Sequence, residues 1–301
     1  MKKTEINKPS FKNGNTEIDW NGQSWAERKF SHPENTVRIA TAFSGIGSPE
    51  MALHQLGVKN EIVFACDIDK PAKKSYFANY DITEDRWYND IRTLDATEYK
   101  DKVDLFVAGV CCQSWSLAGK LGGLEDERGQ LFYDFVRVIC ECAPKVFIFE
   151  NVDNILNHKS TIDGKEVRTW PILMNDMESK FSDAGLHYHL YYRVLNAADY
   201  GVPQHRERVF CIGFLDDTDF LFPAPVKLEK CLRDYLDVDE KETGIHQLTP
   251  RERIRLMGFP DSFKQVVSDM QFSKQAGNSI VVNVMEALYR QMDITKYGVA
   301  A

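Results

Sequence analysis

The sequence lacks the long apolar runs that a membrane protein needs. No stretch approaches the roughly 18–20 consecutive apolar residues of a membrane-spanning helix. Residues 1–15 are polar and lysine-bearing, without the apolar segment of a signal peptide. Internal repeats and low-complexity segments are also missing. These absences predict a cytoplasmic globular protein that has no membrane partner.

Metal-binding cysteine spacing is missing as well. The seven cysteines are an odd number, and the pairs Cys111-Cys112 and Cys140-x-Cys142 are too tightly spaced for a zinc finger. No matching second pair follows either of them. Reduced thiols of a cytosolic protein are the natural interpretation, and no metal is expected.

Positive charge is in short supply. The chain has 37 Lys and Arg against 45 Asp and Glu, a net charge of −8 at pH 7. A protein that grips nucleic-acid phosphates by itself needs basic side chains to neutralise them. The 301 residues, 43% of them hydrophobic, are enough for one large α/β domain or two modest domains.

Apolar strands alternate with helical stretches from residue 37 onward. Strands are predicted over 37–43, 61–65, 103–108, 145–149, 188–195 and 208–214, and helices over 48–56, 131–142 and 170–184. This alternation predicts an α/β fold, a doubly wound and mostly parallel sheet. Such sheets bind ligands at the carboxyl ends of their strands, so the loops that follow the strands are the first candidates for a site.

Two strand ends carry signals for a cofactor. The first strand runs into Phe43-Ser44-Gly45-Ile46-Gly47, where glycines let the backbone approach a ligand closely. Asp67 ends the second strand, where an acid can bind ribose hydroxyls. Together they favour an adenosine-containing cofactor. A purely structural glycine turn and a helix N-cap at Asp67 are the alternatives.

Three more strand ends carry chemically active side chains. Cys112 lies in a loop of small residues, where an activated thiolate would sit, unless it is an inert buried filler. Glu150 leaves an apolar strand, where burial can raise its pKa so that it acts as an acid, or where it caps a turn. Arg206 and Arg208 share one face of a strand and can address an anion or a carbonyl oxygen, or form a solvated charge run.

In this order, the motifs resemble those of the cytosine-5 DNA methyltransferases. The resemblance runs from about Val37 to Gly213 and resumes from Leu248 to about Leu288. Its motifs are Phe-x-Gly-x-Gly (43–47), Asp67, Asp90-Ile91, the Cys-Gln loop (112–113), Arg-Gly-x-Leu-Phe (128–132), Glu-Asn-Val (150–152), Gln-x-Arg-x-Arg (204–208), Arg-Glu…Leu-x-Gly-Phe-Pro (251–260) and Gly-Asn-Ser (277–279).

The resemblance implies a Rossmann-like fold that binds S-adenosylmethionine and releases S-adenosylhomocysteine. Asp67 would bind the ribose and Asp90 the adenine amino group. The Gly277-Asn278-Ser279 turn would fold back beside the first strand, before a last helix over about 280–288. The implied cofactor-binding residues are Phe43, Gly45, Ile46, Gly47, Asp67, Ile68, Asp90, Ile91, Gly109, Leu131, Asn278 and Ser279.

The resemblance also implies a covalent mechanism on a flipped-out cytosine of double-stranded DNA. The Cys112 thiolate adds to carbon 6, and Glu150 donates a proton or hydrogen bond at ring nitrogen 3. Arg208, with Arg206, stabilises charge around the ring oxygen. Carbon 5 then takes the methyl group and loses its proton. Residues 120–127 resemble the family's mobile lid.

Two departures from the family pattern stand out. Cys111 replaces the usual proline before the nucleophile, and Gln113 and Ser116 fix the register that makes Cys112 the nucleophile. The slot for target recognition holds only residues 214–247, with a local charge of −5. That segment is too short and too acidic to read a major groove, so a second protein subunit is expected to supply recognition.

These departures suggest an N-terminal extension (1–36) outside the core and a catalytic and cofactor-binding domain (37–213, completed by 277–296). A much reduced target-recognition domain (214–276) lies between. We expect a cytoplasmic protein of bacterial or phage type. Two alternatives stay open: a transfer-RNA-type cytosine-5 methyltransferase, and a cofactor-binding subunit without activity. Intact Cys112, Glu150 and Arg208 argue against the second alternative.

Overall fold

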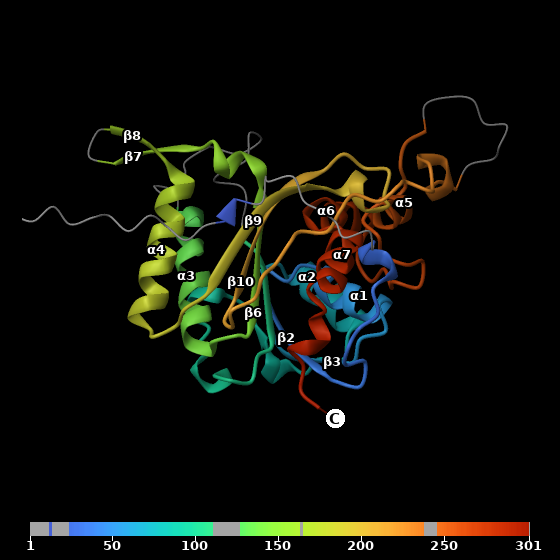
Figure 1. Cartoon of the computed structure of the whole chain (residues 1–301). Coiled ribbons are helices and arrows are strands. Elements are labelled where there is room, and N and C mark those ends of the chain that lie inside the picture. The colour runs from blue at the N-terminus through green and yellow to red at the C-terminus, as the bar shows by residue number, and fades with distance from the viewer. Residues whose placement is uncertain (1–11, 14–23, 111–126, 163–164, 238–245, 301) are drawn as a thin grey trace, which may run out of the picture.

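An eight-stranded sheet forms the centre of the molecule (Figure 1). This computed structural model describes residues 12–13, 24–110, 127–162, 165–237 and 246–300. The strand order is β1-β9-β10-β6-β5-β2-β3-β4. The strands are β1 (Lys12–Asn13), β2 (Val37–Ala42), β3 (Asn60–Cys66), β4 (Trp87–Tyr88), β5 (Leu105–Gly109), β6 (Val146–Val152), β9 (His189–Asn196) and β10 (Glu207–Phe214).

Helices cover both faces of this sheet, as the predicted doubly wound fold requires. On one face α1 (Ser48–Gln55) and α7 (Val282–Met292) pack in one apolar cluster, and on the other α3 (Glu127–Cys142) and α4 (Thr169–Asp183) pack in a second. All seven residues of β6 are buried between the two clusters. A near-continuous apolar strand is typical of the centre of such a sheet.

The sheet is mostly parallel, with one exception that matters for the site. Strands β6, β5, β2, β3 and β4 run parallel to their neighbours, whereas β10 is antiparallel to both β6 and β9. Antiparallel pairing suits β9 and β10, because a short connection joins them. Its register sets Phe210 opposite Glu150 and Arg208 opposite Val152.

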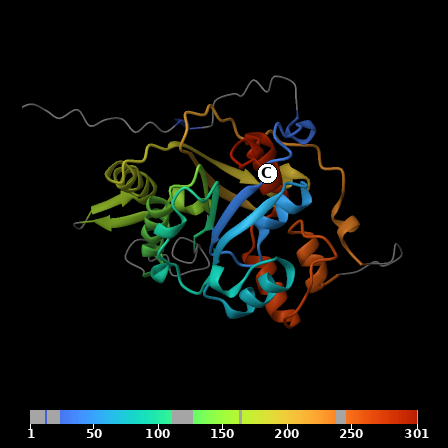
Figure 2. The same ribbon diagram turned by 90° about the horizontal axis from the view of Figure 1, so that it is seen from below.

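Residues 24–36, the strap, pack on the body of the protein (Figure 2). The Trp25 ring is buried, and its Nε1 donates a hydrogen bond to the Ala224 carbonyl at 2.9 Å. Arg290 donates to the Arg28 carbonyl, and Thr36 forms a bridge with Val299. Trp25 therefore belongs to the core, which the prediction for the N-terminal extension did not include, whereas the other side chains of the strap are partly or fully exposed.

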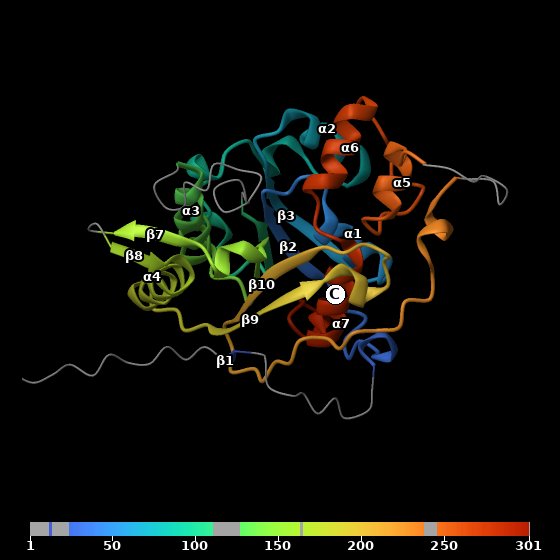
Figure 3. The same cartoon turned by 90° about the horizontal axis from the view of Figure 1, so that it is seen from above.

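Residues 214–276 contribute helices to the side of the sheet that carries α1. Helix α5 (Pro250–Arg255) and helix α6 (Asp269–Asn278) lie near α2 (Lys70–Asn79), opposite α3 and α4 (Figure 3). Their apolar side chains share the cluster of α1 and α7. Helix α5 begins with the predicted cap, since Thr249 and Glu252 form a capping box. The domain boundaries stay a prediction.

A small antiparallel hairpin of β7 (Lys159–Ile162) and β8 (Lys165–Arg168) projects beside α4. The sequence did not predict it, because the hairpin has no apolar alternation. No helix in the described part of the chain is long and apolar enough to cross a membrane.

Candidate active site

A cavity of about 530 Å³ opens at the carboxyl ends of β2, β3 and β5, where sheets of this kind bind their ligands. Its lining brings together nearly all of the predicted residues, although they are scattered over the chain. They are Phe43, Gly45, Ile46, Asp67, Ile68, Asp90, Ile91, Gly109, Leu131, Glu150, Arg206, Arg208, Asn278 and Ser279.

The loop after β2 combines three residues in the left-handed region, Phe43 (φ 54°), Gly45 (φ 55°) and Gly47 (φ 78°). Gly47 does not line the cavity. A Cβ placed there would lie 2.3 Å from the Tyr80 ring, whose hydroxyl donates to the Gly47 carbonyl. Gly47 is therefore needed for packing as well as for its backbone angle.

Ser44 ties this loop to the end of β3. Its hydroxyl donates to the Cys66 carbonyl at 3.1 Å and accepts from the Cys66 amide at 3.0 Å. The Gly45 amide then donates to the Asp67 carboxylate at 2.8 Å. The loop and the acid after β3 thus form one rigid edge of the cavity.

Asp67 accepts main-chain hydrogen bonds and does not cap α2. Its second oxygen accepts the Asp69 amide at 2.8 Å, whereas the N-cap of α2 is Asp69. Burial raises the pKa of Asp67, against the lowering effect of the amides of Asp69 and Gly45. A carboxylate has about four lone-pair sites, so Asp67 keeps acceptor capacity toward the cavity.

Asp90 caps the short 3-10 turn Ile91–Thr93 that follows β4. Its carboxylate accepts the Arg92 amide at 3.0 Å and pairs with the Arg92 guanidinium at 2.6 Å. The hydrogen bond from the Arg92 side chain lowers the pKa of Asp90. Asp90 therefore presents an ionised acceptor at the end of the cavity opposite β6.

Glu150 and Arg208 form a pair across β6 and β10. The antiparallel register makes them diagonal neighbours on one face, and Arg208 Nε lies 3.3 Å from Glu150 Oε1. Burial raises the pKa of Glu150, while Arg208 opposes that rise. The alternatives of a turn cap and a solvated charge run do not hold for these two residues, because both side chains are largely buried within strands.

Gly109 makes room for this carboxyl group. A Cβ at Gly109 would lie 3.3 Å from Glu150 Oε2, closer than an ordinary contact. A side chain here would crowd the acid at the bottom of the cavity, so the absence of one keeps Glu150 accessible.

Arg206 has a role that the sequence did not indicate. Its Nη2 donates to the Gly277 carbonyl at 3.0 Å and to the Ser279 carbonyl at 2.8 Å. Its guanidinium thus holds the main chain of the C-terminal turn, while Arg206 also lines the cavity, and its action with Arg208 on the ring oxygen of the base stays a prediction.

That turn folds back beside the carboxyl end of β2, which the sequence predicted as the first strand. The Ser279 and Ser48 hydroxyls lie 2.5 Å apart, and Asn278 lines the same cavity as Phe43. Helix α7 starts at Val282 and continues to Met292, later and longer than the predicted 280–288.

Some residues of the cavity were missed, and some predicted ones cannot be placed. Lys274 and Gln275 line the cavity, and their position directly before the Gly-Asn-Ser motif was the available signal. Cys112 and nearly all of the predicted lid (120–127) lie outside the described residues; β5 and α3, which flank them in sequence, contribute Gly109 and Leu131 to the cavity. In the described part of the chain, no cluster of His, Cys, Asp and Glu could hold a metal ion.

A doubly wound sheet with an acid after its second strand and a buried Glu–Arg pair at the neighbouring strand ends defines a Rossmann-like methyltransferase. Residues 37–242 and 226–293 match the family of C-5 cytosine-specific DNA methylases, and the chain belongs to this family. It is accordingly a DNA cytosine-5 methyltransferase, of a family and fold that use S-adenosylmethionine.

Curated relatives and a solved structure agree with this placement. The Type II methyltransferase M.SsoII of Shigella sonnei is 31% identical, over 83% of this chain and 78% of the relative. M.NlaX of Neisseria lactamica is 31% identical, over 85% and 96%. The Dnmt2 methyltransferase of S. pombe shares the fold, with a TM-score of 0.64 at 20% identity over 85% of this chain and 98% of that one.

Proposed function

We propose that this enzyme methylates carbon 5 of a flipped-out cytosine in double-stranded DNA through a covalent Cys112 adduct, with a second protein contributing to target recognition. The observation that carries the catalytic part is the buried Glu150–Arg208 pair, which lies in the same cavity as Asp67 and Asp90. A cofactor site alone would not need that pair.

The cavity fits S-adenosylmethionine in size and in chemistry. Its volume of about 530 Å³ is in the range of sites for ligands of this size. Asp67 would accept the ribose hydroxyls and Asp90 the adenine amino group, while the backbone of Gly45 allows close approach. When bound, the cofactor supplies the methyl group.

The protein side chains then divide the work on the base. The Cys112 thiolate bonds to carbon 6, and the electrons of the 5,6 double bond move toward carbon 5. Protonated Glu150 donates to ring nitrogen 3, a role that its raised pKa favours. Arg208 stabilises charge near the ring oxygen. After carbon 5 is methylated, loss of its proton expels Cys112 and restores the double bond.

The nucleophile is tested by exchanging each of the adjacent thiols. Cys112→Ser should abolish incorporation of tritiated methyl groups while calorimetric binding of S-adenosylmethionine stays nearly intact, because the thiolate attacks the base and not the cofactor. Cys111→Ser is the matched control and should keep activity. The reverse pattern would show that the register is wrong.

The proposed partner is supported by the short acidic segment 214–247 and by the contacts of the arginines in helix α5, which follows it. Arg251 donates to the Phe263 carbonyl, Arg253 to the Leu248 carbonyl, and Arg255 pairs with Asp237 and Asp261. The alignment to M.SsoII spans 314 positions but only 83% of this chain. It therefore includes positions that the relative has and this chain lacks.

Methylation of mixed-sequence duplex DNA by the purified chain at moderate salt tests the partner. We expect weak binding and slow methylation alone, and recovery of both with a small basic protein encoded next to this one. Site-specific methylation at full rate by the single chain would overturn this part. Preference for structured RNA over the duplex would favour the transfer-RNA alternative.

A further inference from the structure

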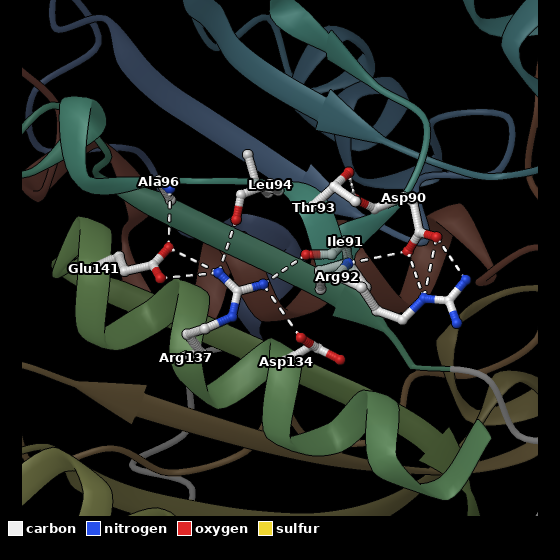
Figure 4. Close-up of polar contacts among 9 residues, drawn as sticks. All are labelled: Asp90, Ile91, Arg92, Thr93, Leu94, Ala96, Asp134, Arg137 and Glu141. Atoms are coloured by element: carbon white, nitrogen blue, oxygen red, sulfur yellow. Dashed lines mark hydrogen bonds and ion pairs between the residues drawn. The ribbon is translucent and has the colours of Figure 1, made fainter. Parts of the chain in front are cut away.

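One helix holds the adenine end of the cavity from outside. Helix α3 lines the cavity at Leu131 and, about two to three turns further along, carries Arg137 and Glu141 against residues 90–96 (Figure 4). Asp90 and Ile91, at the start of that segment, line the cavity. Arg137 and Glu141 themselves do not.

The guanidinium of Arg137 reaches two backbone carbonyls of the segment. Nη2 donates to the Ile91 carbonyl at 2.6 Å, and Nη1 donates to the Leu94 carbonyl at 2.7 Å. Glu141 accepts the Ala96 amide at 2.9 Å, which gives a third attachment. The segment is irregular apart from the short 3-10 turn Ile91–Thr93, so these bonds supply order that a strand would obtain from its ladder.

Two carboxylates keep Arg137 in this orientation. Asp134 Oδ1 lies 3.2 Å from Nη2, and Glu141 Oε1 lies 2.9 Å from Nη1, one turn away on either side. The side chain is 34% exposed, yet both of its terminal nitrogens are directed at the segment and its flanking acids. The charged guanidinium therefore stabilises the backbone of residues 91–94 through these hydrogen bonds.

Apolar packing fixes the other face of the same segment. Ile91, Leu94 and Ala96 are buried in the cluster that contains Phe135 and Ile139 of α3. Side chains and main chain of the segment are thus both held by α3. A shift of this helix would move Asp90 and Ile91 relative to Asp67, which belongs to a different strand end.

We propose that Arg137 is a positioning residue for cofactor binding, which sets Asp90 and Ile91 against the adenine base through the Ile91 and Leu94 carbonyls. The proposal rests on the proposed function of the cavity. In this proposal, α3 connects two parts of the site: it follows the Cys112 loop in sequence, and it supports Asp90 and Ile91 at the adenine end.

Arg137→Ala is the direct test, with S-adenosylhomocysteine and adenosine as calorimetric probes. The Kd of both should rise about tenfold, a change that the loss of one or two hydrogen bonds produces. The KM for S-adenosylmethionine should rise in parallel, while kcat at saturation stays within about twofold. Arg137→Lys keeps the charge and can reach only one carbonyl, so it should restore part of the affinity.

Arg86→Ala is the matched control. Arg86 is 41% exposed and also combines an ion pair, to Glu61, with a bond to a backbone carbonyl, that of Ile62, but it does not line the cavity. The Kd of Arg86→Ala should equal that of the wild type, even if its melting temperature falls as much as that of Arg137→Ala. This separates positioning from a general loss of stability.

Asp90→Ala completes the design. If Arg137 acts through this segment, the double variant should bind no more weakly than about the Asp90→Ala single variant. An unchanged Kd in folded Arg137→Ala and Arg137→Lys, or full additivity with Asp90→Ala, overturns the proposal. A wild-type protein that binds neither probe, or an Asp90→Ala variant with unchanged affinity, contradicts the proposed function instead.

Discussion

The charged groups around the cavity differ in arrangement from those of α5 and of the described residues packed near it (235–237 and 246–261). Around the cavity, Asp67, Asp90 and Glu150 are each held by neighbouring protein groups and line one shared space. In the second region, the Glu252 carboxylate accepts from the Asp237 amide at 2.6 Å and from His246 Nε2 at 2.8 Å. There the charges satisfy one another.

This difference indicates that charged side chains of the same types can be arranged toward a cavity in one region and toward one another in a second region. Reading base edges requires donors and acceptors that are free to leave the protein surface. Arg255 is committed to Asp237 and Asp261, so α5 stabilises the short segment and offers little to DNA. The following variants test whether this contrast is real.

The largest effect is expected from Glu150→Gln, which keeps the shape of the side chain but removes its proton. We expect kcat for methyl transfer to fall about 10²–10⁴-fold, the usual contribution of a general acid. Affinity for S-adenosylhomocysteine should change little. Single-turnover methyl incorporation measures the loss, with exposed Glu229→Gln as the control. A variant with wild-type kcat would remove Glu150 from the chemistry.

Glu252→Gln should affect stability and leave the chemistry of each folded molecule intact. Glu252 is fully buried, and removal of one partner from a buried pair costs about 3 kcal/mol of unfolding free energy. Urea unfolding at pH 7 measures it. Loss of kcat without loss of stability would erase the contrast between the two regions.

The same carboxylate predicts how this stabilisation depends on pH. Burial alone would raise its pKa, but hydrogen bonds from His246, Asp237 and Thr249 lower the pKa of Glu252 to about 2. A depressed pKa stabilises the fold above the ordinary pKa of about 4.3. The difference in free energy of unfolding between the wild type and Glu252→Gln should therefore shrink as the pH falls from about 4 toward 2.

Asp67→Ala and Asp90→Ala should weaken cofactor binding to a smaller degree. Each variant loses a charge-assisted hydrogen bond, worth on the order of 1.5–3 kcal/mol, while the stability of the rest of the fold is retained. Calorimetric titration with S-adenosylmethionine measures the change. Unchanged affinity in both variants would mean that the cavity holds something else.

The smallest effect within the physiological range concerns pH. In the proposed mechanism Glu150 acts in its protonated form, and burial raises its pKa, so kcat should decline as the pH rises through that pKa. Glu150→Gln should lose this alkaline limb, since an amide does not titrate. A limb that persists in the variant would belong to another group.

Features that depend on strand order were predictable from the sequence, whereas features that depend on side-chain reach were not. Asp67, Gly109 and Glu150 follow apolar strands, and parallel strands bring their ends to one edge whatever the details. Arg206 could not be assigned to the Gly277 and Ser279 carbonyls, because 71 residues separate Arg206 from Gly277. No local pattern records such a contact.

The strap and the Arg137 cluster were missed for the same physical reason. Trp25 lies in a polar stretch without a periodic pattern of apolar residues, and its indole bonds to a distant carbonyl at Ala224. Arg137 with Asp134 and Glu141 has the spacing of an ordinary exposed helix face. Arg137 and Glu141 support residues 91–96 only because the fold places that segment against this face of α3.

The contact of the Gly277-Asn278-Ser279 turn with the start of α1, just after β2, has a consequence for the order in which the cavity forms during synthesis. Ser279 bonds to Ser48, and α7 packs against α1, so residues 277–279 add their wall of the cavity only after β2, β3, β5 and β6 have been synthesised. A nascent chain can pair β2, β3, β5 and β6 earlier, but it cannot enclose the ligand. A chain interrupted before Gly277 would therefore carry Glu150 without a closed cavity.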